Sequence, residues 1–260
     1  MENSLMNLFF ILLLLVIMIN LVRLWRPMAQ GELFSSALLY IAVITFVAIL
    51  ALRTSTGGRI PFANSYEFTL LFSGGVLLFA IFVRRGLDSP LFDLTVGLVA
   101  ILLLSVAGTF SSEIRPLMPA LQSGWLYAHV ATAVIAYGSF ALAACLGMVY
   151  LAQTGESGLS LSALDERIYK LVVGGFTFLT IVIITGAVWA EEVWGSWWSW
   201  DPKETWSLVS WLVYSAYLHA RRNYNWKGQK SAWMVIIGFA IVIFTLFGVR
   251  LLLPGLHSYL

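Results

Sequence analysis

The stretch that decides the fold lies close to the start of the chain. Residues 5–22 read LMNLFFILLLLVIMINLV, which is eighteen residues without a charged side chain. A helix needs about 20 mainly apolar residues to cross about 30 Å of hydrocarbon, because each residue adds about 1.5 Å. No Lys or Arg precedes this run and no small-residue cleavage site follows it. We therefore expect a retained membrane span and not a signal peptide.

Comparable apolar runs recur along the rest of the sequence. Hydrophobic residues make up 60% of the chain and charged residues 11%, whereas soluble domains carry about 25% charged residues. The pattern predicts an all-α, polytopic membrane helix bundle of about eight transmembrane helices, forming a single integral membrane domain over residues 1–260. The expected spans are 5–22, 34–52, 68–83, 91–108, 126–150, 170–189, 204–220 and 231–253.

The Lys and Arg residues predict the orientation of these spans, because the cytoplasmic connections of membrane proteins are enriched in them. With the N-terminus outside, ten Lys and Arg residues fall on the cytoplasmic side and five on the outer side. This excess predicts an N-out, C-out topology. The ten are Arg23, Arg26, Arg84, Arg85, Arg167, Lys170, Arg221, Arg222, Lys227 and Lys230, and the five are Arg53, Arg59, Arg115, Lys203 and Arg250.

Tryptophan is concentrated between the sixth and seventh expected spans. Residues 189–211 contain seven of the eleven Trp residues of the chain. Each offers a large flat apolar face and one N–H that needs a partner. Anchoring at a membrane interface explains isolated residues such as Trp233, but four within seven residues exceed what anchoring needs. We interpret the Trp-rich stretch, residues 189–206, as an external loop that forms a platform for a large planar ligand. The four clustered residues are Trp194, Trp197, Trp198 and Trp200.

The three histidines fall on two sides of the expected bundle. His129 lies in the first turn or so of the fifth span and His257 follows the eighth helix, so both are expected near the outer face. A capping-box-like start places Asp201 at the N-cap of the seventh helix. His219 follows Asp201 by 18 residues, which is about 27 Å of helix. We therefore expect His219 deep in the membrane, toward the cytoplasmic leaflet.

Flat aromatic faces together with imidazoles indicate haem as the ligand. Haem iron takes axial ligands on both faces, and neutral imidazole suits it. His129 and His257 can form one outer bis-histidine pair beside the Trp-rich stretch, whereas His219 would need its opposite ligand from a partner subunit. Cys145 is the single cysteine, so the chain has no CxxCH attachment motif of its own.

Simpler interpretations of the same residues stay open. His219 could snorkel to the interface or bond another helix, and His257 could be a plain exposed residue. Asp201 and Glu204 are most simply helix caps. The sequence does not choose among the arginines that are available to pair with haem propionates. These are Arg53, Arg59, Arg115 and Arg250.

Several segments resemble one known family. Residues 194–206 read WGSWWSWDPKETW, which resembles the WWD signature of haem-handling proteins. With WLYAHV at 125–130, YLHAR at 217–221 and GLHSY at 255–259, the chain resembles the CcsA/ResC family of cytochrome c biogenesis proteins over residues 60–260. The segment 61–67 is similar to the family's Asn-x-Tyr-Glu-Ser region, but Phe68 stands in place of its Ser, so no role is carried over there. Residues before 60 match only in hydropathy.

The resemblance implies a haem-binding membrane subunit of a cytochrome c synthase, a haem lyase acting with a CcsB/ResB-type partner. It would move haem b to the outer face and present it for thioether attachment to the CxxCH motif of apocytochrome c. The resemblance implies His129 and His257 as external ligands of the haem iron and His219 as a transmembrane ligand. The membrane would be a bacterial inner membrane or a thylakoid membrane, with the Trp-rich stretch on the periplasmic or lumenal side. No nucleic acid partner is expected.

Two other functions, a haem transporter and a membrane cytochrome b, are alternatives to a haem lyase. A haem transporter or exporter without ligation chemistry would need the same residues, and no nucleophile or acid–base pair in the sequence marks an enzyme. A membrane cytochrome b usually places two ligand histidines on each of two helices, which three histidines on separate segments do not fit. The alternative to a lyase is therefore the transporter.

Overall fold

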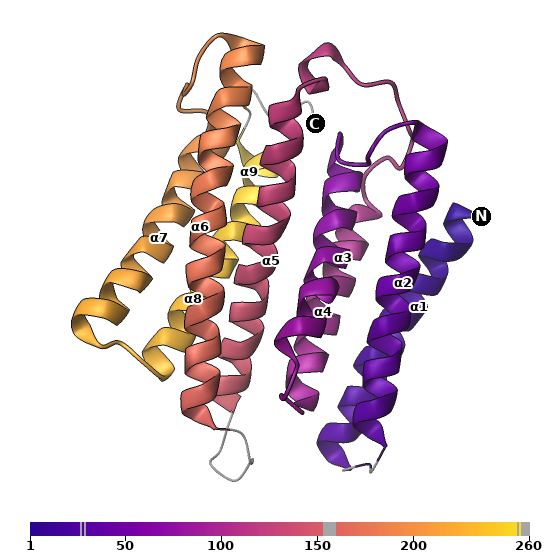
Figure 1. Cartoon of the computed structure of the whole chain (residues 1–260), viewed down its shortest axis with the longest axis vertical. Helices are drawn as coiled ribbons and strands as arrows, with labels where there is room; N and C mark the ends of the chain where they lie inside the picture. The colour runs from indigo at the N-terminus through magenta and orange to yellow at the C-terminus, as the bar shows by residue number, and fades with distance from the viewer. Residues whose placement is uncertain (27, 29, 153–159, 254, 256–260) are drawn as a thin grey trace. The chain divides into compact units, whose positions relative to one another are not determined.

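The computed structural model describes residues 1–26, 28, 30–152, 160–253 and 255 (Figure 1). Seven of its helices are long and apolar enough to cross a membrane, with α8, η2 and α9 continuous as one of them. The prediction of an all-α, polytopic membrane bundle is confirmed. The elements are α1 Glu2–Trp25, α2 Gly31–Gly57, α3 Ser65–Val83, α4 Pro90–Ala107, the 3₁₀ helix η1 Pro119–Leu121, α5 Gly124–Ala152, α6 Leu161–Trp194, α7 Pro202–Tyr224, α8 Gln229–Ile243, the π-helical turn η2 Phe244–Gly248 and α9 Val249–Leu252.

The helix α7 differs from the other expected spans. It has 23 residues, which is about 34 Å of helix and long enough to cross a membrane. It is not among the seven apolar helices of the described chain, because polar and charged residues such as Lys203, Ser207 and Arg221 are distributed along it. The count of eight spans and the N-out, C-out orientation stay predictions.

The chain forms two compact units, Met1–Pro116 (unit 1) and Leu117–Leu260 (unit 2). In unit 1, α1 packs against α2 and α4, and α3 packs against α4 and α2. In unit 2, α5 packs along α6 and α8, and α7 packs against α6 and α8. Consecutive helices within each unit run in opposite directions (Figure 1). The single membrane domain over residues 1–260 stays a prediction.

At one end of the unit 1 helices, acidic and basic side chains form ion pairs with one another. Glu67 of α3 has a side chain that is 1% exposed and lies between two arginines. Its oxygens are 3.2 Å from Arg53 Nη2 and 2.8 Å from Arg59 Nη1. Arg53 also binds Glu2 at 2.5 Å and lies over the ring of Tyr66 at 4.7 Å. This cluster therefore contains two acids and two bases.

A second cluster closes the opposite end of unit 1. Asp93 of α4 lies 2.8 Å from Arg84 Nη2 and 3.7 Å from Arg23 Nη1, and Arg23 also binds Asp88. The hydroxyl of Ser35 donates to Asp93 at 2.8 Å. Here too, two bases face two acids, so both ends of unit 1 have compensated charges.

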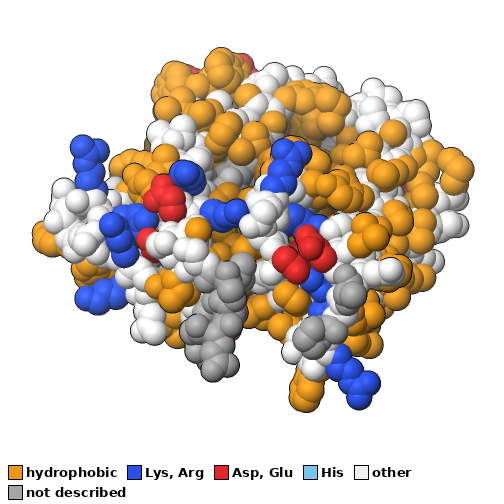
Figure 2. Space-filling view, turned by 60° about the horizontal axis from the view of Figure 1, so that its bottom comes forward, with side chains coloured by type: hydrophobic (Ala, Val, Ile, Leu, Met, Phe, Trp, Pro, Cys, Tyr) orange, Lys and Arg blue, Asp and Glu red, His pale blue; other side chains and the backbone are white. Residues whose placement is uncertain are grey.

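In unit 1, the α1–α2 and α3–α4 connections lie at the same end of the helices, and in unit 2 the α7–α8 connection lies at the end opposite to the α6–α7 connection (Figure 1). Lys and Arg side chains are visible on the face of the chain that Figure 2 turns forward. These connections hold residues expected on the cytoplasmic side, among them Arg26, Arg85 and Lys227. The end that carries the α6–α7 connection belongs to the outer side in the predicted topology.

Candidate functional site

The helix α6 continues through the first part of the Trp-rich stretch. It ends at Gly195, whose φ of +69° is left-handed and whose N–H donates to Glu191 O at 2.9 Å. Glycine adopts this conformation at a helix C-terminus without a Cβ penalty, and residues 189–194 contain no Gly or Pro that would end the helix earlier. Trp189 and Trp194 are therefore helical, and the non-helical connection is loop 195–201, shorter than the loop expected over residues 189–206.

The helix start after this loop is as predicted. Asp201 is the N-cap of α7, with Pro202 in the first helical position. The carboxylate of Asp201 accepts from the Lys203 N–H at 2.9 Å, and the Glu204 carboxylate accepts from the Asp201 N–H at 3.1 Å. Glu204 also accepts from the Ser199 N–H at 2.8 Å. The capping network thus fixes the loop as well as the helix end.

Two of the tryptophans fix the end of α6 to the rest of unit 2. Trp189 is 2% exposed, and its Nε1–H donates to Ala120 O at 2.9 Å. The ring of Trp194 packs edge-on against the ring of Trp189, with 5.0 Å between centroids. Ala120 lies in η1, the short helix before α5, so this bond joins the end of α6 to the segment that leads into α5.

Other tryptophans of the stretch face outward. The side chains of Trp197 and Trp200 are 57% and 67% exposed. The ring of Trp198 packs edge-on against Trp200 at 5.8 Å, and Trp200 has a φ of +61°. A bulky residue in this left-handed region costs about 1–3 kcal/mol, and such strain clusters at functional sites. The loop therefore holds apolar ring faces toward the surroundings at an energetic cost.

His129 lies in the second turn of α5 and faces α6. Its Nδ1 is 2.9 Å from Val182 O, and its ring stacks near Trp189 with 6.4 Å between centroids. A carbonyl can only accept, so Nδ1 carries the proton and the lone pair of the neutral ring lies on Nε2. A backbone carbonyl that orients a histidine in this way is the usual outer partner of an iron or zinc ligand.

The imidazole of His129 is held closely by Gly186 of α6. A Cβ atom at Gly186 would lie 2.8 Å from both Cε1 and Nδ1 of His129, which is closer than real Cβ contacts. Gly186 follows Val182 by one helical turn, so the same face of α6 provides the hydrogen-bond acceptor and the space for the ring. The ring position thus depends on the absence of a side chain at residue 186.

His219 lies far along α7 and faces outward. Its side chain is exposed, and its Nδ1 is 2.9 Å from Asn223 Nδ2. The exposed Leu212 and Ala216 lie on the same face of α7, at helical spacings of seven and three residues. Because α7 is continuous from Pro202, the separation of about 27 Å of helix from the N-cap is retained.

His257 lies outside the described residues, whereas Gly255 two positions earlier is described. A Cβ atom at Gly255 would overlap Asp201 Oδ2 and would lie 3.0 Å from Pro202 Cδ. Gly255 therefore lies against the junction of loop 195–201 with α7.

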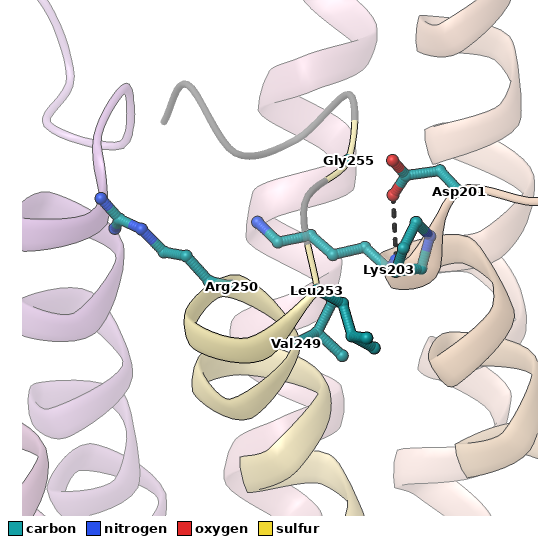
Figure 3. Close-up of a pocket in the computed structure, with 7 residues that line it drawn as sticks. Asp201, Lys203, Val249, Arg250, Leu253 and Gly255 are labelled. Carbon is teal, nitrogen blue, oxygen red and sulfur yellow. Dashed lines mark hydrogen bonds between the residues drawn. The ribbon is translucent and has the colours of Figure 1, made fainter.

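A pocket lies at this junction (Figure 3). It is lined by Asp201, Pro202, Lys203, Val249, Arg250, Leu253 and Gly255. Burial and the nearby Arg250 lower the pKa of Lys203 from its ordinary value of 10.5 to about 8, and the opposing effect of Asp201 is smaller. From the sequence, Lys203 contributed only to the topology prediction, whereas Arg250 was also one of the four arginines available to haem propionates. The position of Lys203 inside the WDPKETW segment was the available signal.

The comparisons with known proteins identify the family. The family model described as cytochrome C assembly protein matches residues 4–257. The chain belongs to this family. The match begins at residue 4, so it includes the segment before residue 60, where the sequence showed a likeness only in hydropathy.

Individual relatives agree with this assignment. The cytochrome c biogenesis protein CcsA of Guillardia theta is 34% identical over 94% of this chain and 93% of its own length. CcsA of Prochlorococcus marinus strain NATL1A is 36% identical over 81% of this chain and 79% of its own length. CcsA of Chlamydomonas reinhardtii is 38% identical over 83% of this chain and 65% of its own length. The chain is thus a CcsA-type cytochrome c biogenesis protein.

A solved structure shares the fold. The cytochrome c haem lyase CcmF superposes on 95% of this chain with a TM-score of 0.71 and 17% identity, and the chain spans 46% of its length. With its apolar helices and its family, the chain is an integral membrane protein that functions in cytochrome c maturation.

Unit 2 brings most of the predicted site residues to one end. The start of α5 with His129, the end of α6, loop 195–201 and the start of α7 with Asp201 all lie there, as does Gly255. His219 lies toward the other end of α7. The arrangement offers one end with ring faces, an oriented imidazole and a cationic pocket, and a separate exposed histidine.

Proposed function

We propose that the end of unit 2 that carries loop 195–201 binds haem b and presents it to an apocytochrome c, as the haem-binding subunit of a cytochrome c synthase. The observation that carries the proposal is the orientation of His129. Its Nδ1–H donates to Val182 O, which directs the basic lone pair to Nε2, the nitrogen suited to axial ligation of iron. His257 is proposed as the opposite ligand, because Gly255, two positions before it, contacts Asp201.

The ring faces of the Trp-rich stretch are proposed as the floor for the porphyrin. Trp197 and Trp200 are the most exposed of them. Trp198 packs edge-on against Trp200, and Trp194 packs edge-on against the buried Trp189. Asp201 contributes by capping α7 and so holding the loop. Stacked aromatic contacts of this kind add about 0.5–1.5 kcal/mol each beyond area burial.

The proposed reaction is the addition of the two cysteine thiols of CxxCH to the two haem vinyl groups. In each addition the S–H bond breaks, the sulfur bonds to one vinyl carbon and the hydrogen goes to the other, so the addition itself consumes no oxidant or reductant. The chain contributes positioning, which is worth up to about 7–11 kcal/mol in well-oriented reactions. The histidine of CxxCH would displace one of the two axial histidines as the cytochrome binds.

His219 is proposed as a ligand at a second haem site, toward the cytoplasmic leaflet. Its exposure on the outer face of α7 suits a site completed by a ligand from a CcsB/ResB-type partner. Haem would pass from this site to the outer one, on the periplasmic side of a bacterial inner membrane or the lumenal side of a thylakoid membrane. In the complex, His219→Ala should lower haem occupancy at both sites and change the spin state. An unchanged spectrum would contradict the second site.

The decisive experiment is co-expression of the chain with a CcsB/ResB-type partner and an apocytochrome c, scored for covalent haem. His129→Gly should lower the covalent product and the haem content, and added imidazole should restore them, because free imidazole can occupy the vacated position. Thr132→Gly is the matched control, since it places the same helix-weakening residue one turn later on α5 and retains the imidazole. Haem held at a His129-dependent site without covalent product would instead favour a haem transporter. A haem content that does not respond to His129→Gly would contradict the site.

A further inference from the structure

His129 and His219 have opposite kinds of hydrogen-bond partner. The Nδ1 of His129 lies 2.9 Å from Val182 O, a carbonyl oxygen that can only accept. The Nδ1 of His219 lies 2.9 Å from Asn223 Nδ2, an amide nitrogen that can only donate. A neutral imidazole has one N–H and one lone pair. The proton of His129 therefore lies on Nδ1, whereas that of His219 lies on Nε2.

The lone pair of His219 is engaged by Asn223 in this arrangement. Asn223 Nδ2 is also 3.4 Å from Nε2 of His219, so the amide donor faces both ring nitrogens. Histidines that bind a metal almost always donate their other N–H to a carbonyl, a carboxylate or a water molecule. His219 thus has a donor where a ligand histidine has an acceptor. Iron binding at the second haem site proposed above requires a change of partner at His219.

The required acceptor is part of the same side chain. The Asn223 amide has a carbonyl oxygen beside its NH₂ group, and a half-turn about the last side-chain torsion exchanges the two. This torsion is broad and roughly two-fold, so the exchange leaves the rest of the side chain in place. With the oxygen beside Nδ1, the His219 ring takes its proton on Nδ1 and carries the lone pair on Nε2, as His129 does. Solvent can carry the proton, because both side chains are exposed.

The last turn of α7 holds the two side chains beside each other. Asn223 follows His219 by four residues, so both lie on one face of the helix. The ring of Tyr224 packs edge-on against that of His219, with 5.7 Å between centroids. Arg221, between them in sequence, is buried and binds Asp165 of α6 at 2.8 Å, which fixes this turn. Two neighbours therefore contact the imidazole, and one of them can present either a donor or an acceptor.

We infer that Asn223 is a positioning residue of the second haem site, where its side-chain oxygen accepts from His219 Nδ1–H and leaves Nε2 to bind the iron. This inference rests on the proposed role of His219 as a ligand. It implies that donation by the Asn223 amide nitrogen and iron binding by His219 exclude each other.

The test uses two substitutions that separate accepting from donating. Asn223→Asp keeps an acceptor of similar size and removes the donor, whereas Asn223→Leu removes both. The chain is purified in complex with its CcsB/ResB-type partner, and the second haem is measured as the part that His219→Ala removes. Asn223→Leu should weaken binding of this haem about tenfold, as the loss of such an outer partner typically does. Asn223→Asp should retain the affinity and lower the reduction potential of this haem, because a carboxylate makes the imidazole more basic.

Asn225→Asp is the matched control for the added negative charge. Asn225 ends α7 with a φ of +50°, a conformation that Asp also adopts. It follows His219 by six residues, so Asn225→Asp should leave haem affinity unchanged. Its effect on the reduction potential should be smaller than that of Asn223→Asp.

A measurement without haem keeps this inference distinguishable from the proposed function. Nitrogen NMR of the full chain in detergent, at a pH where the imidazole is neutral, reports which ring nitrogen carries the proton. His219 should be protonated on Nε2 in wild type and on Nδ1 in Asn223→Asp, and His219→Ala assigns its signals. Protonation on Nδ1 in both proteins would overturn the inference.

The haem measurements have equally definite outcomes. If Asn223→Asp and Asn223→Leu weaken the second haem equally, donation and not acceptance by Asn223 matters, and the inference is wrong. If neither changes its affinity or potential while His219→Ala removes it, the inference is wrong and the second site stands. If His219→Ala removes no haem from the complex, the second site and this inference fall together.

Discussion

The two units hold their polar side chains in different ways. In unit 1, Glu67 is 1% exposed and lies between Arg53 and Arg59, so opposite charges are paired inside the bundle. In unit 2, the half-buried imidazole of His129 bonds to one backbone carbonyl, Val182 O, and fits beside Gly186. Breaking a buried ion pair is strongly destabilising, whereas a histidine oriented by a backbone carbonyl is typical of a metal ligand. The comparison therefore favours a structural role for the charges of unit 1 and supports the ligand binding that we propose for unit 2.

The largest expected effect comes from breaking the complete cluster. Glu67→Gln removes the carboxylate that both Arg53 and Arg59 bind. Losing one partner of a buried pair leaves an uncompensated charge and costs about 3–5 kcal/mol. We expect this loss in the free energy of unfolding, measured for the full chain in mixed micelles. The haem spectrum of the protein that remains folded should be unchanged.

Glu113→Gln provides the control for this prediction. It removes the acid of an exposed pair, with side chains that are 73% and 62% exposed. Such pairs contribute about 0–1 kcal/mol. If Glu67→Gln and Glu113→Gln lowered the free energy of unfolding equally, burial of the ion pair would not increase its contribution to stability. A loss of haem from folded Glu67→Gln protein would show that unit 1 takes part in ligand binding.

A smaller effect is expected from Gly186→Ala in unit 2. The new methyl group would overlap the His129 ring at 2.8 Å, so the ring must turn and give up its bond to Val182 O. Overpacking of this kind costs about 1–3 kcal/mol. We expect this overpacking cost to appear mainly as about tenfold weaker haem binding. The fraction of the bound haem that is low-spin should also fall, as measured by absorption spectroscopy. Added imidazole should restore part of that fraction.

Gly174→Ala is the matched control on the same helix. A Cβ atom at Gly174 meets no atom within 4 Å, and both substitutions increase helix propensity equally. The spectrum of Gly174→Ala should equal that of wild type. If Gly186→Ala also leaves the spectrum unchanged, His129 is not positioned by α6 as we propose.

Much of the fold could be predicted because local chemistry determines it. The apolar runs predicted the membrane helices, and the segment Asp201–Glu204 predicted the start of α7, since capping depends on residues within one turn. The end of α6 was less predictable. Trp189 and Trp194 are compatible with a loop or a helix, and the buried contact of Trp189 with Ala120 O involves residues far apart in the sequence.

The sequence indicated which residues to propose for the site, but not which neighbours hold each of them in place. His129 was proposed from the sequence as a ligand, and that role stays a prediction. Its bond to Val182 and its contact with Gly186 depend on the packing of α5 against α6. The four arginines were equivalent in the sequence, because pairing with Glu67 requires the folded unit 1. Lys203 was assigned only to the outer surface, since its closeness to Arg250 depends on the packing of α7 against the end of the last helix.

The smallest effect on haem affinity is expected from the exposed tryptophan rings of loop 195–201. Trp197→Ala removes a ring that is 57% exposed and that we propose to contact the porphyrin. The expected loss is about 1 kcal/mol, or roughly fivefold in haem affinity, without loss of membrane insertion. Trp233→Ala is a control of equal exposure, 56%, at the start of α8, and should leave haem affinity unchanged. Equal haem affinity in wild type and Trp197→Ala would make Trp197 an interfacial anchor.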